Sequence, residues 1–250
     1  MGPGLRLTVL GASGSYPGRG QACSGYLLQA ATPGQDGSTN VWLDAGPGTM
    51  ANLQEHIGLD AVDAIVLSHA HPDHWSDLEG FFVACRYVVE RSGIPVYAPH
   101  GLQELLRVPS PTSPTLVWHE IGDRDQVTIG PMRLTFSRTD HMIETLAARV
   151  DVDGRSLGYS ADSGAGWSLD ELGPGIDLAL CEATFLKDRE GSIQHMSARQ
   201  AGATARAAGA ERLIVTHVWP IIDLADTKAE AEEAFGGPVV LAVMNESHDV

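Results

Sequence analysis

Four side chains of the kinds that bind metal ions occur within six residues, in the segment Ser68–His74 (SHAHPDH). Imidazole nitrogen suits zinc or iron, and a carboxylate extends the choice to manganese. Residues two apart in an extended segment point the same way, so His69 and His71 can face one ion together. Asp73 and His74 follow a rigid proline, and a turn there would direct them to a second position. This spacing predicts a metal site rather than a histidine-rich surface loop.

The elements around this cluster indicate how it is positioned. The apolar run 64–67 predicts a β-strand that ends where the cluster begins. In α/β sheets, ligands usually bind at the carboxyl ends of the strands. A second strand, 40–43, likewise ends in an acid, Asp44. The metal site is therefore expected where several strand ends meet.

The second half of the chain repeats this order weakly. A strand at 156–159 precedes Asp162, and a strand at 213–216 precedes His217, as 40–43 precedes Asp44 and 64–67 precedes His69. Two similar β/α halves that meet face to face would bring both sets of strand ends to one edge. We therefore predict an α/β fold, a four-layer αββα sandwich of two β-sheets flanked by helices, in a single domain over residues 1–250.

Alternation and capping signals predict the remaining elements. Strands are expected at 5–10, 26–30, 94–97, 116–118, 126–129, 132–137, 145–150, 177–181 and 239–243. Helices are expected at 50–57 after an N-cap at Thr49, at 78–90, at 102–106, after a capping box at 197–200, and at 227–235. Loops are expected at 33–39 and 108–115, and the glycine-rich segment 11–18, which lacks the P-loop spacing, is expected beside an active site.

Composition restricts the partners. The 250 residues carry a formal charge of −16 with no basic run, which disfavours long nucleic acid and allows a small anionic substrate at a metal centre. No stretch approaches the ~18 apolar residues of a membrane span. Residues 1–6 lack the pattern of a secretory signal, and the three cysteines are widely spaced. These features predict a cytoplasmic protein with free thiols and no membrane association.

Five motifs, in this order, resemble those of the metallo-β-lactamase fold superfamily: Asp44, the HxHxDH run, His141, Asp162 and His217. The resemblance implies two divalent ions, with Zn²⁺ the first choice and Mn²⁺ or Fe²⁺ as alternatives. The implied ligands are His69, His71 and His141 for one ion, Asp73, His74 and His217 for the other, and Asp162 as the bridge. Asp73 is also implied to be catalytic, and Asp44 to orient the ligands. Taken singly, His141, Asp162 and His217 could each be an ordinary polar residue at a loop, turn or strand end.

Two further segments resemble the ribonuclease Z and cyclic-nucleotide phosphodiesterase branch of that superfamily. Residues 181–185 (CEATF) are similar to its HEAT segment, with cysteine in place of histidine, and residues 195–197 (HMS) are similar to its HST segment. The resemblance implies that His195 protonates the leaving oxygen and that Glu182 orients it. The alternative is that His195 merely precedes a helix.

The departure from the branch bears on the substrate. Ribonuclease Z proteins of the long-arm type carry a tRNA-binding insertion between the ligands that match His141 and Asp162, and here that interval spans only 21 positions. We therefore expect a dinuclear phosphodiesterase that hydrolyses small phosphodiesters, such as cyclic nucleotides, by attack of a metal-bridging hydroxide. The alternatives are a ribonuclease Z-type tRNA 3′-end endonuclease, a carboxylic ester, lactone, thioester or β-lactam hydrolase, and a non-catalytic metal-binding or nucleotide-sensing module. By analogy with related phosphodiesterases, a homodimer is expected.

Overall fold

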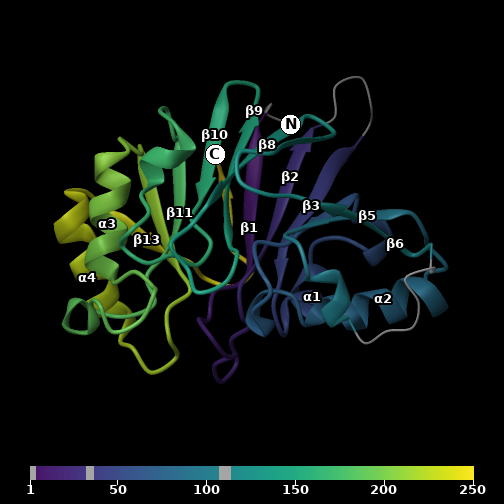
Figure 1. The fold of residues 1–250 in the computed structure, drawn as a ribbon, viewed down its shortest axis with the longest axis horizontal. Coiled ribbons are helices and arrows are strands. Elements are labelled where there is room, and N and C mark those ends of the chain that lie inside the picture. The colour runs from purple at the N-terminus through teal and green to yellow at the C-terminus, as the bar shows by residue number, and fades with distance from the viewer. Residues whose placement is uncertain (1–3, 32–36, 107–113) are drawn as a thin grey trace.

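Two β-sheets packed face to face, with helices on their outer faces, form the protein (Figure 1). The structure is a computed structural model, and it describes residues 4–31, 37–106 and 114–250. Counted over these residues, each sheet contains seven strands. This arrangement of layers is the predicted αββα sandwich. The loops predicted at 33–39 and 108–115 lie partly outside the described residues.

The two sheets share one plan: three antiparallel pairings of neighbouring strands on one side and three parallel pairings on the other. In spatial order, the first sheet consists of β14 (Ser247–Asp249), β1 (Leu5–Gly11), β2 (Gly25–Ala31), β3 (Ser38–Ala45), β4 (Ala64–Val66), β5 (Ile94–Ala98) and β6 (Leu116–Glu120). The second consists of β13 (Val239–Leu241), β12 (Arg212–Thr216), β11 (Leu178–Glu182), β10 (Arg155–Tyr159), β9 (Leu146–Val152), β8 (Met132–Arg138) and β7 (Gln126–Ile129). Strands β3 to β6 run parallel to one another, as do β10 to β13.

This shared plan corrects the predicted internal repeat. The chain passes from β3 to β4 as it passes from β10 to β11, so the counterpart of β4 is β11. His69 follows β4, whereas His217 follows β12, the counterpart of β5. The pairing of His69 with His217 is therefore displaced by one strand. The two acids do belong to equivalent strands, although Asp44 is the penultimate residue of β3 and Asp162 lies three residues beyond β10.

In the described part of the chain, four α-helices cover the outer faces. In Figure 1, α1 (Thr49–Leu53) and α2 (Asp77–Tyr87) lie on the side of the first sheet, and α3 (Ala198–Ala207) and α4 (Leu224–Phe235) on the side of the second. Short 3-10 turns occur at Leu59–Ala61, Pro72–His74, Gln103–Leu105, Leu169–Leu172 and Lys187–Arg189. Within the described ranges, no helix is long and apolar enough to cross a membrane.

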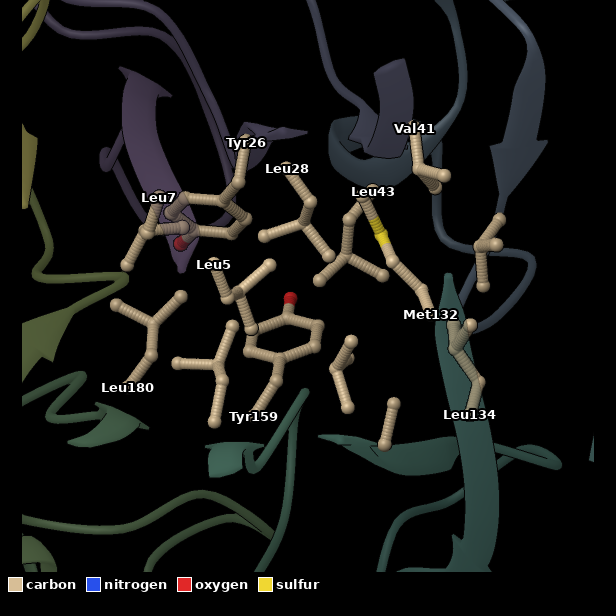
Figure 2. Close-up of a cluster of buried hydrophobic side chains, with 14 of the residues drawn as sticks. Leu5, Leu7, Tyr26, Leu28, Val41, Leu43, Met132, Leu134, Tyr159 and Leu180 are labelled. Atoms are coloured by element: carbon tan, nitrogen blue, oxygen red, sulfur yellow. The ribbon is translucent and has the colours of Figure 1, made fainter. Parts of the chain in front are cut away.

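The main core lies between the sheets. Figure 2 shows Leu28 and Leu43 of the first sheet packed with Leu134 and Tyr159 of the second. The rings of Tyr26 and Tyr159 meet edge to face, with centroids 5.4 Å apart. Each fully buried apolar side chain of this size stabilises the fold by about 1.5–3 kcal/mol. This core therefore holds the two sheets together.

Several predicted boundaries were wrong. The helix expected at 50–57 ends at Leu53, and its cap is Gly48, with a φ of 93°, because the Thr49 hydroxyl donates to the Gly46 carbonyl instead. The helix expected at 102–106 is a single 3-10 turn. The helix expected at 227–235 begins at Leu224, capped by the Asp223 side chain. The capping box at 197–200 is present.

Candidate metal centre

All seven predicted ligand side chains meet at one edge of the sandwich, beyond the carboxyl ends of β4, β8, β10 and β12. Except for His71, they are at most 9% exposed. The backbone turns sharply here, because Asp44, Ala161 and His217 adopt φ values of 56°, 49° and 56°. Such left-handed conformations cost about 1–3 kcal/mol each and occur often at functional sites. The fold sustains this strain at the point where the side chains converge.

One group consists of three histidines and one oxygen of Asp162. His71 Nδ1 lies 3.1 Å from His69 Nε2 and 3.1 Å from His141 Nε2. Asp162 Oδ2 lies 3.5 Å from His69 Nε2 and 4.0 Å from His141 Nε2. His141 donates its Nδ1 proton to the Gln194 carbonyl at 2.9 Å, which leaves Nε2 free to bind an ion. Nitrogen and carboxylate donors at this separation suit a single divalent ion.

The second group faces the other oxygen of Asp162. Its Oδ1 lies 3.2 Å from His74 Nε2 and 3.4 Å from His217 Nε2. Asp73 Oδ2 lies 3.6 Å from His74 Nε2 and 3.2 Å from His217 Nε2. Asp162 therefore directs one oxygen to each group, the arrangement that a bridging carboxylate requires.

Asp44 orients two of the proposed ligands, His74 directly and His69 through Ser68. Its Oδ2 accepts hydrogen bonds from His74 Nδ1 at 2.8 Å, Ser68 Oγ at 2.8 Å and the Tyr159 hydroxyl at 2.7 Å. Its Oδ1 accepts the Ser68 amide at 2.7 Å. Ser68 Oγ in turn accepts from His69 Nδ1 at 2.9 Å. Because both histidines donate through Nδ1, their Nε2 lone pairs are directed at the cluster.

The donor set fits a cation. His74 Nε2 and Asp162 Oδ1 are buried and have no hydrogen-bond partner among the residues that the structure describes, although they lie 3.2 Å apart. Burial lowers the pKa of His74, but the carboxylates of Asp162, Asp73 and Asp44 raise it well above its usual value, so positive charge is stabilised here. Burial and the neighbouring His74 lower the pKa of His69 to about 4, which keeps its nitrogen neutral and able to bind a metal.

His195 and Glu182 lie at the edge of the same cluster. His195 Nδ1 lies 3.1 Å from Glu182 Oε1, and its ring stacks on His217 with centroids 5.4 Å apart. Burial lowers the pKa of His195, but the Glu182 carboxylate outweighs burial and raises it to about 9. Glu182 is fully buried and also accepts the Ser163 amide at 2.6 Å. The Nδ1 nitrogen of His195 is the one that faces Glu182.

Sequence reasoning missed three hydroxyl groups and left Cys181 open. Ser68, Tyr159 and Thr184 each bond to Asp44 or Glu182, and only Ser68 had a signal, its place beside the histidines. Cys181, where the related segment has histidine, is buried in the apolar cluster beneath the helices, and burial raises the pKa of its thiol. Cys181 is not part of the histidine–aspartate cluster.

The predicted glycine-rich loop does lie beside the site. A Cβ atom at Gly14 would lie 2.3 Å from the His217 carbonyl oxygen, so only glycine allows this close approach. Ser13 and Val218 form an isolated bridge between the loop and the segment that carries His217. The loop therefore supports the backbone of His217.

An αββα sandwich with a buried histidine–aspartate cluster at its strand ends has the architecture of metallo-β-lactamase-fold hydrolases. Residues 39–218 match the model described as "Beta-lactamase superfamily domain", and the chain belongs to that family.

Several proteins are similar to this chain over most of its length. An uncharacterized protein of Mycobacterium tuberculosis is 35% identical over 98% of this chain and 92% of its own length. The probable metallo-hydrolase YhfI of Bacillus subtilis is 30% identical over 95% of this chain and 97% of its own. Its crystal structure superposes with a TM-score of 0.89 over 100% of both chains, at 25% identity. A ribonuclease Z of Mycobacterium bovis is 27% identical over 87% of each chain.

Proposed function

We propose that this metallo-hydrolase is a dinuclear phosphodiesterase acting on small phosphodiesters, with 3′,5′-cyclic nucleotides as the first candidates. His69, His71 and His141 would hold one ion, Asp73, His74 and His217 the other, and Asp162 would bridge them. Zn²⁺ is the first choice for this donor set, and Mn²⁺ or Fe²⁺ are the alternatives. When bound, the ions supply Lewis-acid activation of water and neutralise charge on the phosphoryl oxygens.

The observation that carries the proposal is the His195–Glu182 pair. An alkoxide leaving group needs a proton, and a positioned histidine can donate it. Glu182 holds His195 in place through Nδ1 and stabilises its charged form, so that Nε2–H is available as the acid at neutral pH. Asp44 and Ser68 keep His74 and His69 in the tautomers that direct Nε2 toward the proposed metal site. In this proposal, Asp44, Ser68 and Glu182 orient histidine side chains, and His195 protonates the leaving group.

A ribonuclease Z-type activity is the second candidate, and the similarity to a ribonuclease Z favours it. Strands β9 and β10 occupy most of the interval between His141 and Asp162, which leaves no room for a tRNA-binding insertion there. The formal charge of −16 would also repel a polyanion. A small diester therefore fits better.

Two other classes remain as rivals. Hydrolysis of a carboxylic ester, lactone, thioester or β-lactam would use the same ions but would not require His195. A non-catalytic sensor would have no need of a leaving-group acid. We also propose a homodimer, by analogy with related phosphodiesterases. A cytoplasmic location is proposed as well, and the three free, buried cysteines support it.

The test is hydrolysis by the purified protein loaded with Zn²⁺ or Mn²⁺. Four substrates separate the candidates: bis-p-nitrophenyl phosphate, cAMP, a precursor tRNA and nitrocefin. Cleavage of the first two is expected. If neither diester is cleaved with any metal, the proposal is wrong, and cleavage of the precursor tRNA or of nitrocefin alone would favour the corresponding rival.

A further inference from the structure

Each half of the molecule contains one buried carboxylate that orients two histidines. In the first half, Asp44 binds His74 directly and binds His69 through the hydroxyl of Ser68. In the second half, Glu182 binds His195 directly, through the 3.1 Å contact to Nδ1. Glu182 also accepts a hydrogen bond from the Thr184 hydroxyl.

Thr184 links Glu182 to His217. Its hydroxyl donates a short hydrogen bond to Glu182 Oε2 and lies 2.9 Å from His217 Nδ1. A hydroxyl has one proton, and a carboxylate can only accept it. The Thr184 oxygen must therefore accept from His217 Nδ1–H. This fixes the tautomer of His217 and leaves its Nε2 lone pair facing Asp73 at 3.2 Å and Asp162 at 3.4 Å.

The positions of Ser68 and Thr184 in the two sheets agree with this role. Ser68 lies two residues beyond the end of β4, and Thr184 lies two residues beyond the end of β11, the equivalent strand of the other sheet. Both side chains are almost completely buried, at 2% and 0% exposed. Each places a hydroxyl between a carboxylate and a histidine. The two halves differ in the histidine that contacts the carboxylate directly: His74 points into the cluster of proposed ligands, whereas His195 lies at its edge.

We propose that Thr184 is a positioning residue that holds His217 for the ion near Asp73 and His74. The inference rests on the proposed dinuclear site, and it predicts a selective effect. Removing the hydroxyl frees the His217 ring to change tautomer, and loss of a hydrogen bond of this kind typically lowers metal affinity 10- to 100-fold. The ion held by His69, His71 and His141 should be little affected.

The experiment is titration of the metal-free full-length protein with Zn²⁺ by calorimetry, with bound zinc counted by elemental analysis. Thr184→Val, which keeps the shape and removes the hydroxyl, should weaken one of two ions about 10- to 100-fold. Thr184→Ser, which keeps the hydroxyl, should bind both ions as the wild type does. Thr227→Val is the matched control, because Thr227 is a buried threonine of α4 whose hydroxyl donates to the Asp223 carbonyl away from the site.

Each outcome decides a separate question. Wild-type affinity for both ions in Thr184→Val, or an equal loss in Thr227→Val, would overturn the role of Thr184. If Thr184→Val does not fold, folded Thr184→Ser decides, since loss of an ion there would contradict a role for the hydroxyl. The Nδ1–H signal of His217 in NMR spectra should persist in Thr184→Ser. A wild type that binds two ions but cleaves no diester would overturn the proposed function and leave the titration result standing.

Discussion

Replacement of His195 by alanine should slow the release of alkoxide leaving groups far more than the release of p-nitrophenolate. An alkoxide is nearly as basic as hydroxide, so its departure depends on a proton from the enzyme. The p-nitrophenolate ion is a weak base and leaves without one. Hydrolysis of cAMP releases an alkoxide, and hydrolysis of bis-p-nitrophenyl phosphate releases p-nitrophenolate. Comparing the two substrates therefore separates proton donation by His195 from the other effects of the substitution.

The structure sets the expected size of the effect. The Glu182 carboxylate raises the pKa of His195 to about 9. About 99% of His195 is then in the acid form at pH 7, two units below that value. A positioned general acid contributes about 10²- to 10⁴-fold, or about 3–5 kcal/mol of transition-state stabilisation. We expect a loss of that size on cAMP and less than about tenfold on bis-p-nitrophenyl phosphate.

The assay is kcat/KM for both substrates at pH 7, with metal content measured on each preparation. His100→Ala is the matched control, because the His100 side chain is 75% exposed and its Nδ1 lies 2.9 Å from Glu120 Oε2. It should leave both rates unchanged. His195→Ala should retain its bound metal, since His195 lies at the edge of the cluster and is not among the proposed ligands.

Equal losses on the two diesters would refute the reasoning, because they would show that His195 acts in a step common to both. An undiminished rate on cAMP would also refute it. Loss of bound metal in His195→Ala would instead assign the residue to the metal centre.

Three further predictions follow from the same contacts. Because the pKa of His195 is raised from 6.5 to about 9, its acid form persists below about pH 9 and is lost above it, so the rate on cAMP should fall as the pH rises through 9; a rate unchanged to pH 10 would contradict this. Asp44→Asn weakens the hydrogen bond that holds His74 and should lower Zn²⁺ affinity 10- to 100-fold in a calorimetric titration, whereas the exposed control Asp60→Asn should not; equal affinities would exclude the orienting role. Tyr159→Phe removes one of four hydrogen bonds to the buried Asp44 carboxylate and should lower the free energy of unfolding of the metal-free protein by about 1.5–3 kcal/mol in urea, and an unchanged midpoint would show that this bond is not stabilising.

The fold was predictable because its signals are local and repeated. Short runs rich in β-branched residues, such as 64–67 and 213–216, predict buried strands, and the order of acids and histidines around them indicated two similar halves. Boundaries were less predictable where a tertiary contact overrides the local signal. Thr49 has the chemistry of an N-cap, but its hydroxyl bonds to the tight turn at Gly46 instead. Strand β14 forms only because the end of the chain pairs with β1, and no local pattern predicts that pairing.

The sequence by itself determined the proposed ligand set and its order along the chain. Four of the seven proposed ligands occur within the segment 69–74, where residue type and spacing predict a metal site. The other three, His141, Asp162 and His217, were predicted only through the resemblance to a known superfamily. The sequence also placed His195 and Glu182 together, through the resemblance of their segments.

The tertiary structure alone decided how these side chains are aimed. The Tyr159 hydroxyl reaches Asp44 across 115 positions of the sequence, and Thr184 reaches His217 across 33. Hydroxyl groups of this kind occur throughout the chain, and nothing in residue type or spacing distinguishes the ones that bond to a ligand. The physical reason is that a hydrogen bond depends on distance and direction to within a few tenths of an ångström. Only the packing of the two sheets against each other sets those quantities.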